Sequence, residues 1–384
     1  MIAIIELYQH SEVIRHYCIL LKNGDQQVRI YASSIVYQML KDFHQHPNFQ
    51  WIVKVENQSI DSFLKSNYES IQEAKLVFIT TALNNFKSFY QLSANYKTIL
   101  LVHNAHSFLD PQKFLDLDDS QNIWDRFRWL KIQANRSHYY KKQLLQNLVG
   151  LIFPTEIVLN YVKDHFTLPA HLELTALPFS AYEQQPPIVS KDRSVTITIP
   201  CTVNSEQRDY NLVLNVFKKI ENNLSENINL VLLGKPKNDG HKIIAGFQAI
   251  ASPRIKITAF KDTISHQEYE QWLQVSDFLI LPLKPESKNH IYKERLGFSK
   301  ISGGINDMIR HGTPALIPSY YPIDGALEKM IERFTEEDLS ELLLHWINQK
   351  RYLIFKTHVD SALINYSVSK MQLEFHQKIS RFLT

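Results

Sequence analysis

The sequence predicts an α/β protein with two domains, each built on a parallel sheet with helices packed against it. The chain has 384 residues, and a single domain usually contains about 100 to 200. Short apolar runs alternate with amphipathic stretches in two successive series, which is the pattern of strands joined by crossover helices. The composition, with 44% hydrophobic and 21% charged residues, is that of an ordinary globular protein.

The first series contains six apolar runs that we expect to form buried strands. They begin near residues 2, 27, 49, 75, 97 and 148 and read IAIIEL, QVRIYA, FQWIVKV, KLVFIT, KTILLVH and LVGLIF. Over residues 169–193, proline and polar residues interrupt this pattern, as is typical of a domain crossing. The sequence therefore predicts an N-terminal domain over residues 1–183.

The second series predicts a further sheet within a domain over residues 184–350. Its strands read SVTITIP, NINLVLLG, RIKITAF, DFLILPL and TPALIPS. Ser265 and Glu268 have the spacing of a capping box, and Thr335 with Asp338 could cap a later helix. Residues 351–384 read as a helical segment that could pack back on the N-terminal domain.

Charge and cysteine content exclude several classes of function. The formal charge of +3 is nearly balanced, so we expect no nucleic-acid partner. Cys18 and Cys201 lack the spacing of a metal site or a disulfide framework. The acidic run over residues 116–119 is typical of a solvated segment, and we expect neither a metal nor a cofactor. The sequence shows no signal peptide and no long apolar window, which predicts a cytoplasmic protein.

Glycine is scarce, yet four of the ten glycines fall within one stretch of the second half: Gly297, Gly303, Gly304 and Gly312. A loop that enters a helix presents free backbone N–H groups, and small residues there let a phosphate approach closely. The alternative is that these glycines serve turns and close packing. For Gly312 and the following Pro314 we favour that alternative, because the pair is typical of a helix end.

If a helix begins near Ser302, the residues around its start suit a nucleotide diphosphate. Lys300, Ser302 and the backbone at Gly303 and Gly304 could hold the diphosphate. Asp307, one turn further on, could accept hydrogen bonds from a ribose diol. The sequence therefore predicts a nucleotide-binding helix entrance.

The order of strand DFLILPL, loop, glycine-bearing helix and strand TPALIPS resembles the donor site of GT-B glycosyltransferases, nearest to family 4, over residues 195–320. The resemblance implies two Rossmann-like domains that face a cleft, a nucleotide diphosphate sugar as donor substrate, and a metal-independent, retaining transfer. Asp307 stands five residues before Gly312, where that family has a ribose-binding Glu. Ser299 stands where the family has a second Glu that contacts the sugar. Ser299 is therefore a candidate catalytic residue, and Lys300 could take over part of that role.

Two further cations follow strands of the second half. Arg208 comes after SVTITIP, where the resemblance implies a basic residue that reaches the diphosphate, although a solvated loop charge is an equally good interpretation. Lys235 follows NINLVLLG at the strand end where ligands of open α/β sheets bind.

Because ligands of open α/β sheets bind at the carboxyl ends of the strands, residues that follow strands of the first half are candidates for binding the acceptor. His10 and Glu12 follow the first strand, although helix capping by Ser11 explains that segment equally well. His103, Asn104 and His106 follow strand KTILLV. Histidine can bind a sugar hydroxyl or handle a proton near neutral pH, and we prefer His106 over His103 as catalytic. The alternative for both is a core or capping histidine.

Residues 124–143 predict a basic amphipathic helix, with six Lys or Arg residues against one Asp. Such a helix could contact an anionic membrane, which would bring the protein to a lipid-linked acceptor at the inner face of that membrane. An ordinary surface helix that packs its aromatic residues inward is the alternative, and we favour it.

Together these features predict a glycosyltransferase of the hexosyl type. We expect it to move a sugar onto a hydroxyl of a glycan, lipid-linked or protein acceptor, in bacterial surface polysaccharide or glycoconjugate synthesis. The alternatives are an inactive nucleotide-sugar-binding or scaffolding protein, and a GT-B-fold epimerase or phosphorylase.

Overall fold

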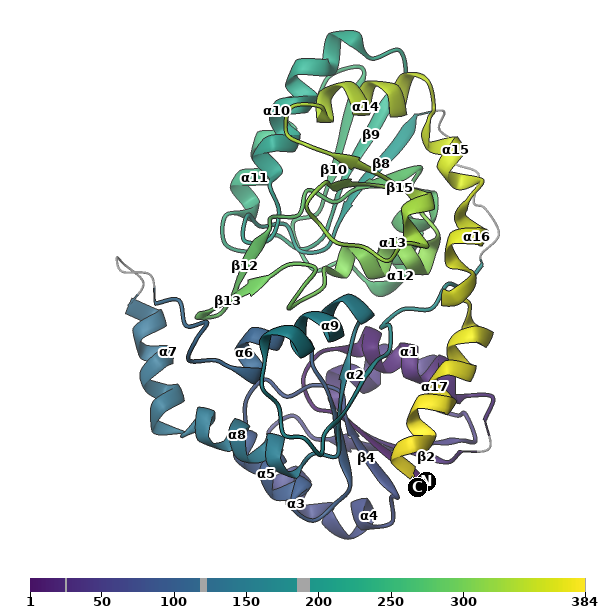
Figure 1. Ribbon diagram of the computed structural model, residues 1–384. Helices are drawn as coiled ribbons and strands as arrows, with labels where there is room; N and C mark the ends of the chain where they lie inside the picture. Colours follow the sequence, from purple (N-terminus) through teal and green to yellow (C-terminus); the bar gives the residue numbers. More distant parts are fainter. Residues whose placement is uncertain (25, 118–122, 185–193, 384) are drawn as a thin grey trace.

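A computed structural model describes residues 1–24, 26–117, 123–184 and 194–383. Residues 118–122, which include Asp118 and Asp119 of the acidic run, lie outside this description, as do residues 185–193 of the predicted domain crossing. Within the described part, the chain forms two α/β halves, one above the other in Figure 1.

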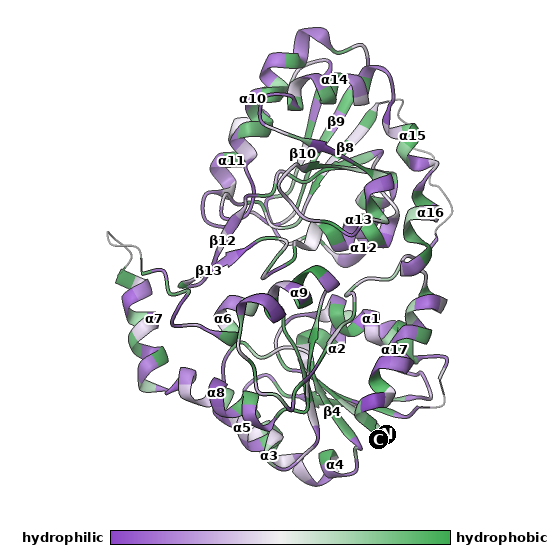
Figure 2. Cartoon of the chain, in the orientation of Figure 1, coloured by the Kyte–Doolittle hydropathy of each residue, from purple (hydrophilic) through white to green (hydrophobic). Residues whose placement is uncertain are grey.

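The first half is built on a seven-stranded parallel sheet in the order β3-β2-β1-β4-β5-β6-β7. Most of its strand residues are apolar and buried, because helices pack on both faces (Figure 2). The strands are β1 (Ile2–Glu6), β2 (Val28–Ser33), β3 (Phe49–Lys54), β4 (Leu76–Ile79), β5 (Thr98–Leu101), β6 (Gly150–Phe153) and β7 (Glu173–Ala176).

Helices connect these strands and begin at polar residues. Ser33 accepts a hydrogen bond from the backbone of Val36, and Thr155 accepts one from Val158, so each side chain satisfies an otherwise free N–H group. The helices are α1 (Ser11–Leu21), α2 (Ser34–Met39), α3 (Ile60–Ser66), α4 (Tyr68–Gln72), α5 (Phe86–Ser93), α6 (Ala105–Leu109), α7 (Ile123–Ala134), α8 (Ser137–Asn147) and α9 (Glu156–His165), with a short 3-10 helix at Lys41–Phe43.

The second half contains a six-stranded parallel sheet in the order β10-β9-β8-β11-β14-β15. A separate antiparallel hairpin, β12–β13, extends from it toward the first half. The strands are β8 (Val195–Pro200), β9 (Ile228–Leu233), β10 (Ile255–Ala259), β11 (Phe278–Ile280), β12 (Glu286–Asn289), β13 (Tyr292–Arg295), β14 (Ala315–Pro318) and β15 (Ile331–Phe334).

The predicted helix caps of this half are present. Ser265 accepts a hydrogen bond from the backbone N–H of Glu268, and Thr335 and Asp338 exchange two hydrogen bonds. The helices are α10 (Tyr210–Ile220), α11 (Gly240–Gln248), α12 (His266–Val275), α13 (Gly303–His311) and α14 (Leu339–Asn348), with 3-10 helices at Glu221–Asn223 and Leu327–Met330.

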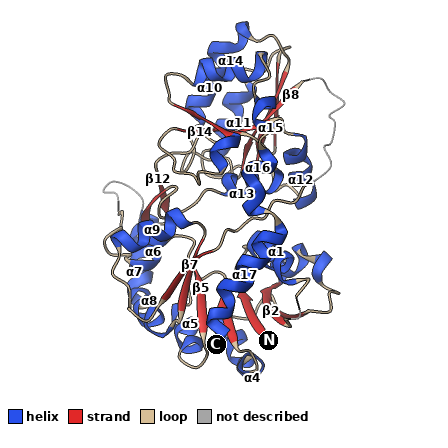
Figure 3. Cartoon of the chain, turned by 45° about the vertical axis from the view of Figure 1, so that its right-hand side comes forward, coloured by secondary structure: helices blue, strands red, loops and turns tan. Residues whose placement is uncertain are grey.

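After α14 the chain returns to the first half (Figure 3). It passes through α15 (Tyr352–Lys356), α16 (Val359–Leu363) and a 3-10 helix at Ile364–Tyr366 into α17 (Val368–Leu383). Helix α17 packs against α1, and Phe382 covers Gly150 so closely that a Cβ there would lie 2.3 Å from the phenyl ring. Both ends of the described chain therefore lie on the first half.

The predicted fold class is confirmed, and each strand predicted from an apolar run is present. Four strands were not predicted: β7, which falls inside the stretch interpreted as a linker, the two strands of the hairpin, and β15. None of the described helices combines the length and the apolar character that crossing a bilayer requires.

Candidate functional site

A cavity of about 670 Å³ lies between the two halves. Segments that follow β1, β5, β8, β9 and β10 line it, so it stands at the carboxyl ends of strands from both sheets. Ligands of open parallel sheets bind at such edges, because crossover loops diverge there and leave a crevice.

Eight of the predicted site residues line this cavity. The first half contributes His10, Glu12, His103 and Asn104, and the second half contributes Lys235, Lys300, Gly303 and Asp307. The strand-end rule selected the first-half residues and Lys235, and the helix entrance selected the others. The fold places all eight around one cavity, although they lie up to about 300 positions apart in the chain.

His106 lies outside the cavity. Its Nδ1 is 2.9 Å from the carbonyl oxygen of Lys293, its Nε2 is 2.8 Å from the hydroxyl of Tyr161, and its ring stacks on Phe114. Burial lowers its pKa to about 4. The geometry does not support a catalytic role for His106 and instead favours the alternative of a structural histidine.

Ser299 is also buried away from the cavity. Its hydroxyl donates to Glu294 Oε2 at 2.6 Å and accepts from the backbone N–H of Arg295 at 2.8 Å. The position that was predicted to contact the sugar therefore holds a loop together, and its neighbour Lys300 is the side chain that reaches the cavity.

Arg208 is 3% exposed and does not line the cavity. Burial opposes its charge, but nearby Cys201 and Tyr210 raise its pKa. Its Nε is buried without a hydrogen-bond partner among the described residues. The alternative of a solvated loop charge is wrong, because the guanidinium is enclosed.

The entrance of α13 is packed too closely for larger residues. Ser302 caps the helix by accepting from Gly304 N at 3.3 Å and is itself fully buried. A Cβ at Gly304 would lie 2.8 Å from Leu281, and one at Gly303 would lie 3.2 Å from Cys201 Sγ. Of these three residues only Gly303 lines the cavity. Gly312 ends the helix at φ 60°, as the sequence predicted.

Asp307 lines the cavity with both carboxylate oxygens already bonded. Oδ2 accepts from the hydroxyl of Tyr269 at 2.7 Å, and Oδ1 accepts from Arg310 at 3.0 Å. Burial raises its pKa, and the charge of Arg310 opposes that rise. A carboxylate offers about four acceptor positions, so lone pairs remain for a ligand hydroxyl.

His10 and His103 lie together on the first-half side. Their rings stack with centroids 4.6 Å apart, and His103 Nε2 is 2.7 Å from the carbonyl oxygen of Thr80. Burial lowers the pKa of His10 and lowers that of His103 to about 3. Both rings are therefore neutral at pH 7.

Lys300, from the second half, is enclosed in the same cavity, and after burial its charge contributes to the lowered pKa of His10 and of His103. Burial lowers the pKa of its ammonium group, while the charge of Glu294 raises it. An anionic ligand stabilises a partly desolvated cation of this kind, because its charge compensates for the hydration that burial has removed.

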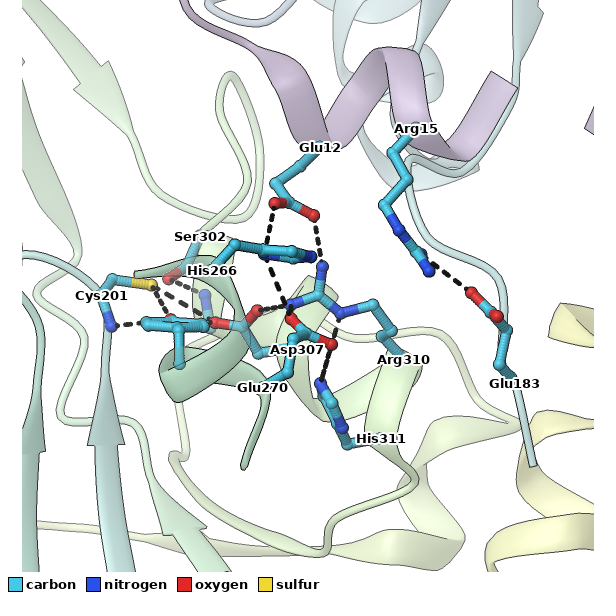
Figure 4. Close-up of polar contacts among 12 residues, drawn as sticks. Glu12, Arg15, Glu183, Cys201, His266, Glu270, Ser302, Asp307, Arg310 and His311 are labelled. Atoms are coloured by element: carbon cyan, nitrogen blue, oxygen red, sulfur yellow. Dashed lines mark hydrogen bonds and ion pairs between the residues drawn. The ribbon is translucent and has the colours of Figure 1, made fainter. Parts of the chain in front are cut away.

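The sequence did not reveal an ion-pair network that crosses the cleft (Figure 4). Arg310 of α13 bonds Glu12 of α1 at 2.5 Å and Glu270 of α12 at 2.8 Å. His266 is 3.3 Å from Glu12, and His311 is 3.2 Å from Glu270. Glu12, predicted to face the acceptor, is therefore engaged with the second half. The only sequence signal was Arg310 and His311 in the last turn of the predicted helix.

No group of three or more His, Cys, Asp or Glu side chains in the described parts of the chain is arranged to hold a metal ion. No known family model and no curated protein sequence matches the chain. Comparison with solved structures, in contrast, shows clear likeness of fold.

Anabaena HepE in complex with UDP-glucose aligns with a TM-score of 0.62 at 12% identity and covers 99% of both chains. The pneumococcal O-GlcNAc transferase GtfA in complex with UDP and GlcNAc aligns with a TM-score of 0.51 at 10% identity over 84% of this chain. This chain spans only 60% of the length of GtfA.

A structure from Listeria monocytogenes, described as a UDP-N-acetylglucosamine 2-epimerase, aligns with a TM-score of 0.53 at 12% identity and covers 99% of this chain and 96% of that one. At such identities the likeness concerns the fold alone. The neighbours include GT-B glycosyltransferases, and the two parallel sheets with a cavity at their facing strand ends match that architecture. The chain has a two-domain GT-B fold.

Proposed function

We propose that this chain transfers a hexosyl group from a UDP-linked sugar to a hydroxyl of a glycan, lipid-linked or protein acceptor, in bacterial surface polysaccharide or glycoconjugate synthesis. The observation that carries the proposal is the α13 entrance, where Lys300, Gly303 and Asp307 line one cavity together. The UDP-bound structures of HepE and GtfA, which share the fold, support a uridine nucleotide.

The donor lies against the second half in this proposal. Lys300 and Lys235 bind the diphosphate together with the backbone N–H of Gly303 at the start of α13, and Asp307 binds the ribose. Arg208 adds positive charge from behind the cavity wall. These cations stabilise the negative charge that develops on the nucleoside diphosphate as the bond to the anomeric carbon breaks, so the transfer needs neither a metal nor a cofactor.

The acceptor enters from the first half. The new bond forms between its hydroxyl oxygen and the anomeric carbon. His10, which is neutral and lines the cavity, takes the hydroxyl proton, while His103 and Asn104 hydrogen-bond the sugars. Retention of configuration is part of the proposal and rests on the resemblance to family 4.

A panel of UDP-, GDP-, ADP- and TDP-linked sugars in a thermal-shift assay tests the donor. A ligand at a hundredfold excess over its dissociation constant stabilises the folded state by about 2.7 kcal/mol. We expect UDP-sugars to raise the melting temperature most. If no nucleotide sugar shifts it, the proposal is wrong.

Lys300→Ala tests the site. We expect affinity for UDP-glucose to fall about tenfold or more, because a charge-assisted hydrogen bond to the diphosphate is lost. Lys261→Ala is the matched control, since Lys261 is an exposed lysine outside the cavity. Isothermal titration calorimetry measures both, and unchanged affinity and turnover in Lys300→Ala would remove this assignment.

An epimerase is the second candidate, favoured by the Listeria structure with the same fold. An epimerase converts UDP-N-acetylglucosamine without an acceptor, whereas a transferase requires one. Proton NMR of UDP-N-acetylglucosamine incubated with the protein alone separates the two. Tight nucleotide binding without turnover on any acceptor would instead favour an inactive binding protein, an interpretation that the burial of Ser299 keeps relevant.

The cytoplasmic location stays a prediction. The membrane contact that the sequence left open for residues 124–143 concerns a surface outside the cleft and is a separate proposal.

A further inference from the structure

Helix α7 presents its apolar side to solvent. Ile123, Trp124, Phe127 and Leu130 are 58–72% exposed, and none of the twelve residues of α7 is buried. Figure 2 shows hydrophobic positions on this helix at the margin of the molecule. The alternative of aromatic residues that pack inward is wrong for Trp124 and Phe127.

The opposite side of α7 faces the protein. Asp125, whose side chain is 13% exposed, forms an ion pair with Lys288 of β12 at 3.2 Å. Trp129 contacts the ring of His138, whose Nε2 lies 2.9 Å from the hydroxyl of Tyr292 in β13. At about 100° per residue, Asp125 lies about 160° from Ile123 and Phe127 around the helix, and Trp129 lies about 120° to 160° from them. These contacts therefore fix the orientation of α7 with its apolar side toward solvent.

The predicted helix over residues 124–143 is broken at Arg136, which has φ 49°. Its second part, α8, is docked on the protein: Lys141 is buried and donates to the carbonyl of Ser107. Of the large apolar side chains that these two helices expose, all but Tyr139 thus lie on α7.

Exposed cations border this surface. Arg126 lies on one flank of the apolar side, and Arg128, which pairs with Asp125 at 3.2 Å, lies on the other. Lys131 lies between Phe127 and Trp124 around the helix. A helix with a central apolar stripe and cationic flanks matches the boundary between anionic headgroups and hydrocarbon in a bilayer. A helix of twelve residues is about 18 Å long and offers roughly 200 Å² of face, well below the about 800 Å² per partner that a stable protein interface needs.

We propose that α7 docks on an anionic lipid bilayer through Ile123, Trp124, Phe127 and Leu130. The hairpin that bonds the opposite side of α7 carries Asn289 and His290, which line the cleft. The docked helix thus holds the cleft close to the bilayer surface, where a lipid-linked acceptor would present its hydroxyl. Docking itself does not depend on the proposed transfer.

Sedimentation with vesicles tests the docking. We expect the protein to bind vesicles of phosphatidylcholine with about 30% phosphatidylglycerol and to bind pure phosphatidylcholine far less, and we expect added salt to weaken binding. Phe127→Ser combined with Leu130→Ser should weaken binding about tenfold or more, because less apolar surface enters the bilayer. The matched control is Ile354→Ser with Leu373→Ser, which replaces equally exposed apolar residues on α15 and α17.

The charges are tested separately. Arg126→Gln with Lys131→Gln should weaken binding to the anionic vesicles, whereas Lys218→Gln with Lys219→Gln, two exposed lysines of α10, should not. The emission of Trp124 should shift to the blue on vesicle addition, and Trp124→Phe should abolish that shift while the protein still binds.

Two results would overturn the proposal. One is wild-type protein that ignores the anionic vesicles, or a Phe127/Leu130 variant that binds them like wild type. The other is a wild-type dimer in light scattering that this variant converts to a monomer, which would assign the surface to self-association. UDP-glucose affinity of the variants, measured in parallel, shows whether the donor site is intact and keeps the two proposals distinguishable.

Discussion

Glu270 is a carboxylate whose ionisation depends on its partners across α12 and α13. Burial disfavours its charge, but the hydrogen bond from His311 and the charge of Arg310 outweigh this and lower its pKa to about 2. The unfolded carboxyl titrates near 4.5. A lowered pKa means that this interaction stabilises the fold fully above about pH 4.5 and is lost as pH falls toward 2.

We therefore expect wild type to lose more stability than Glu270→Gln on acidification. Between pH 6 and pH 3 the stability difference between the two proteins should shrink by about 2 kcal/mol. Urea unfolding at both pH values measures it. Glu268→Gln, an exposed Glu at the start of the same helix, is the control and should follow wild type. An equal pH dependence for wild type and Glu270→Gln would contradict the network.

Among single residues, those whose neighbours in space are also close in the chain were the ones that the sequence could group together. Lys300, Gly303 and Asp307 were found because loop and helix spacing alone bring them together. His106 was misjudged because its partners, Tyr161 and Lys293, lie 55 and 187 positions away. The Glu12–Arg310 pair was missed for the same reason, since its members lie 298 positions apart.

The β12–β13 hairpin joins the second half to the first. Glu294 accepts hydrogen bonds from the backbone of Ser107 at 2.8 Å and of His106 at 3.2 Å, and so satisfies the first N–H groups of α6. The carbonyl of Ser299 accepts from Ala105 N at 2.8 Å. Next to it, Lys293 donates its backbone N–H to the carbonyl of Phe114 at 2.9 Å.

Glu294→Ala should destabilise the protein by about 1–3 kcal/mol, because it leaves two buried N–H groups without an acceptor. It should also increase the radius of gyration in X-ray scattering, because a contact between the halves is lost. Glu286→Ala, at an exposed position at the base of the same hairpin, is the control. Stability and scattering equal to wild type in Glu294→Ala would show that the hairpin does not hold the halves together.

Short strands that contain polar residues could not be predicted from apolar runs in the sequence. The hairpin reads ESKN and YKER, and its strands belong to neither parallel sheet, so no apolar run marks them. Apart from their own pairing, an isolated bridge joins Tyr292 to Leu115. Strand β7 has four residues at the edge of its sheet and follows a proline-containing loop. The central strands were predicted because burial on both faces demands continuous apolar residues.

Helix α17 belongs to the core of the first half although it comes last in the chain. Met371, Phe375, Ile379 and Phe382 are buried, and the ring of Phe375 lies 5.7 Å from that of Tyr17 in α1. The amphipathic pattern predicted a helix here. From the sequence, packing against the N-terminal domain was only one possibility for this helix, because the apolar side of a helix does not specify which element covers it.

Phe375→Ala should cost about 3–5 kcal/mol of unfolding free energy, since it removes a fully buried ring. Leu373→Ala, on the exposed side of the same helix, should change stability by no more than about 0.5 kcal/mol. In Phe375→Ala, amide hydrogen exchange should become faster in β1 and α1, whereas the amides of β8 and β9 should stay protected. Equal effects of the two substitutions would contradict the packing.

The chain crosses between the halves twice, and the two crossings are bonded to each other: Tyr182 N donates to the carbonyl of Tyr366 at 2.7 Å, beside a bridge to Ser367. Figure 1 shows these crossings and the hairpin on opposite sides of the molecule. We therefore expect any rotation of one half against the other to turn about the paired crossings. The hairpin lies on the other side, so such a rotation would separate Glu294 from the backbone N–H groups of α6.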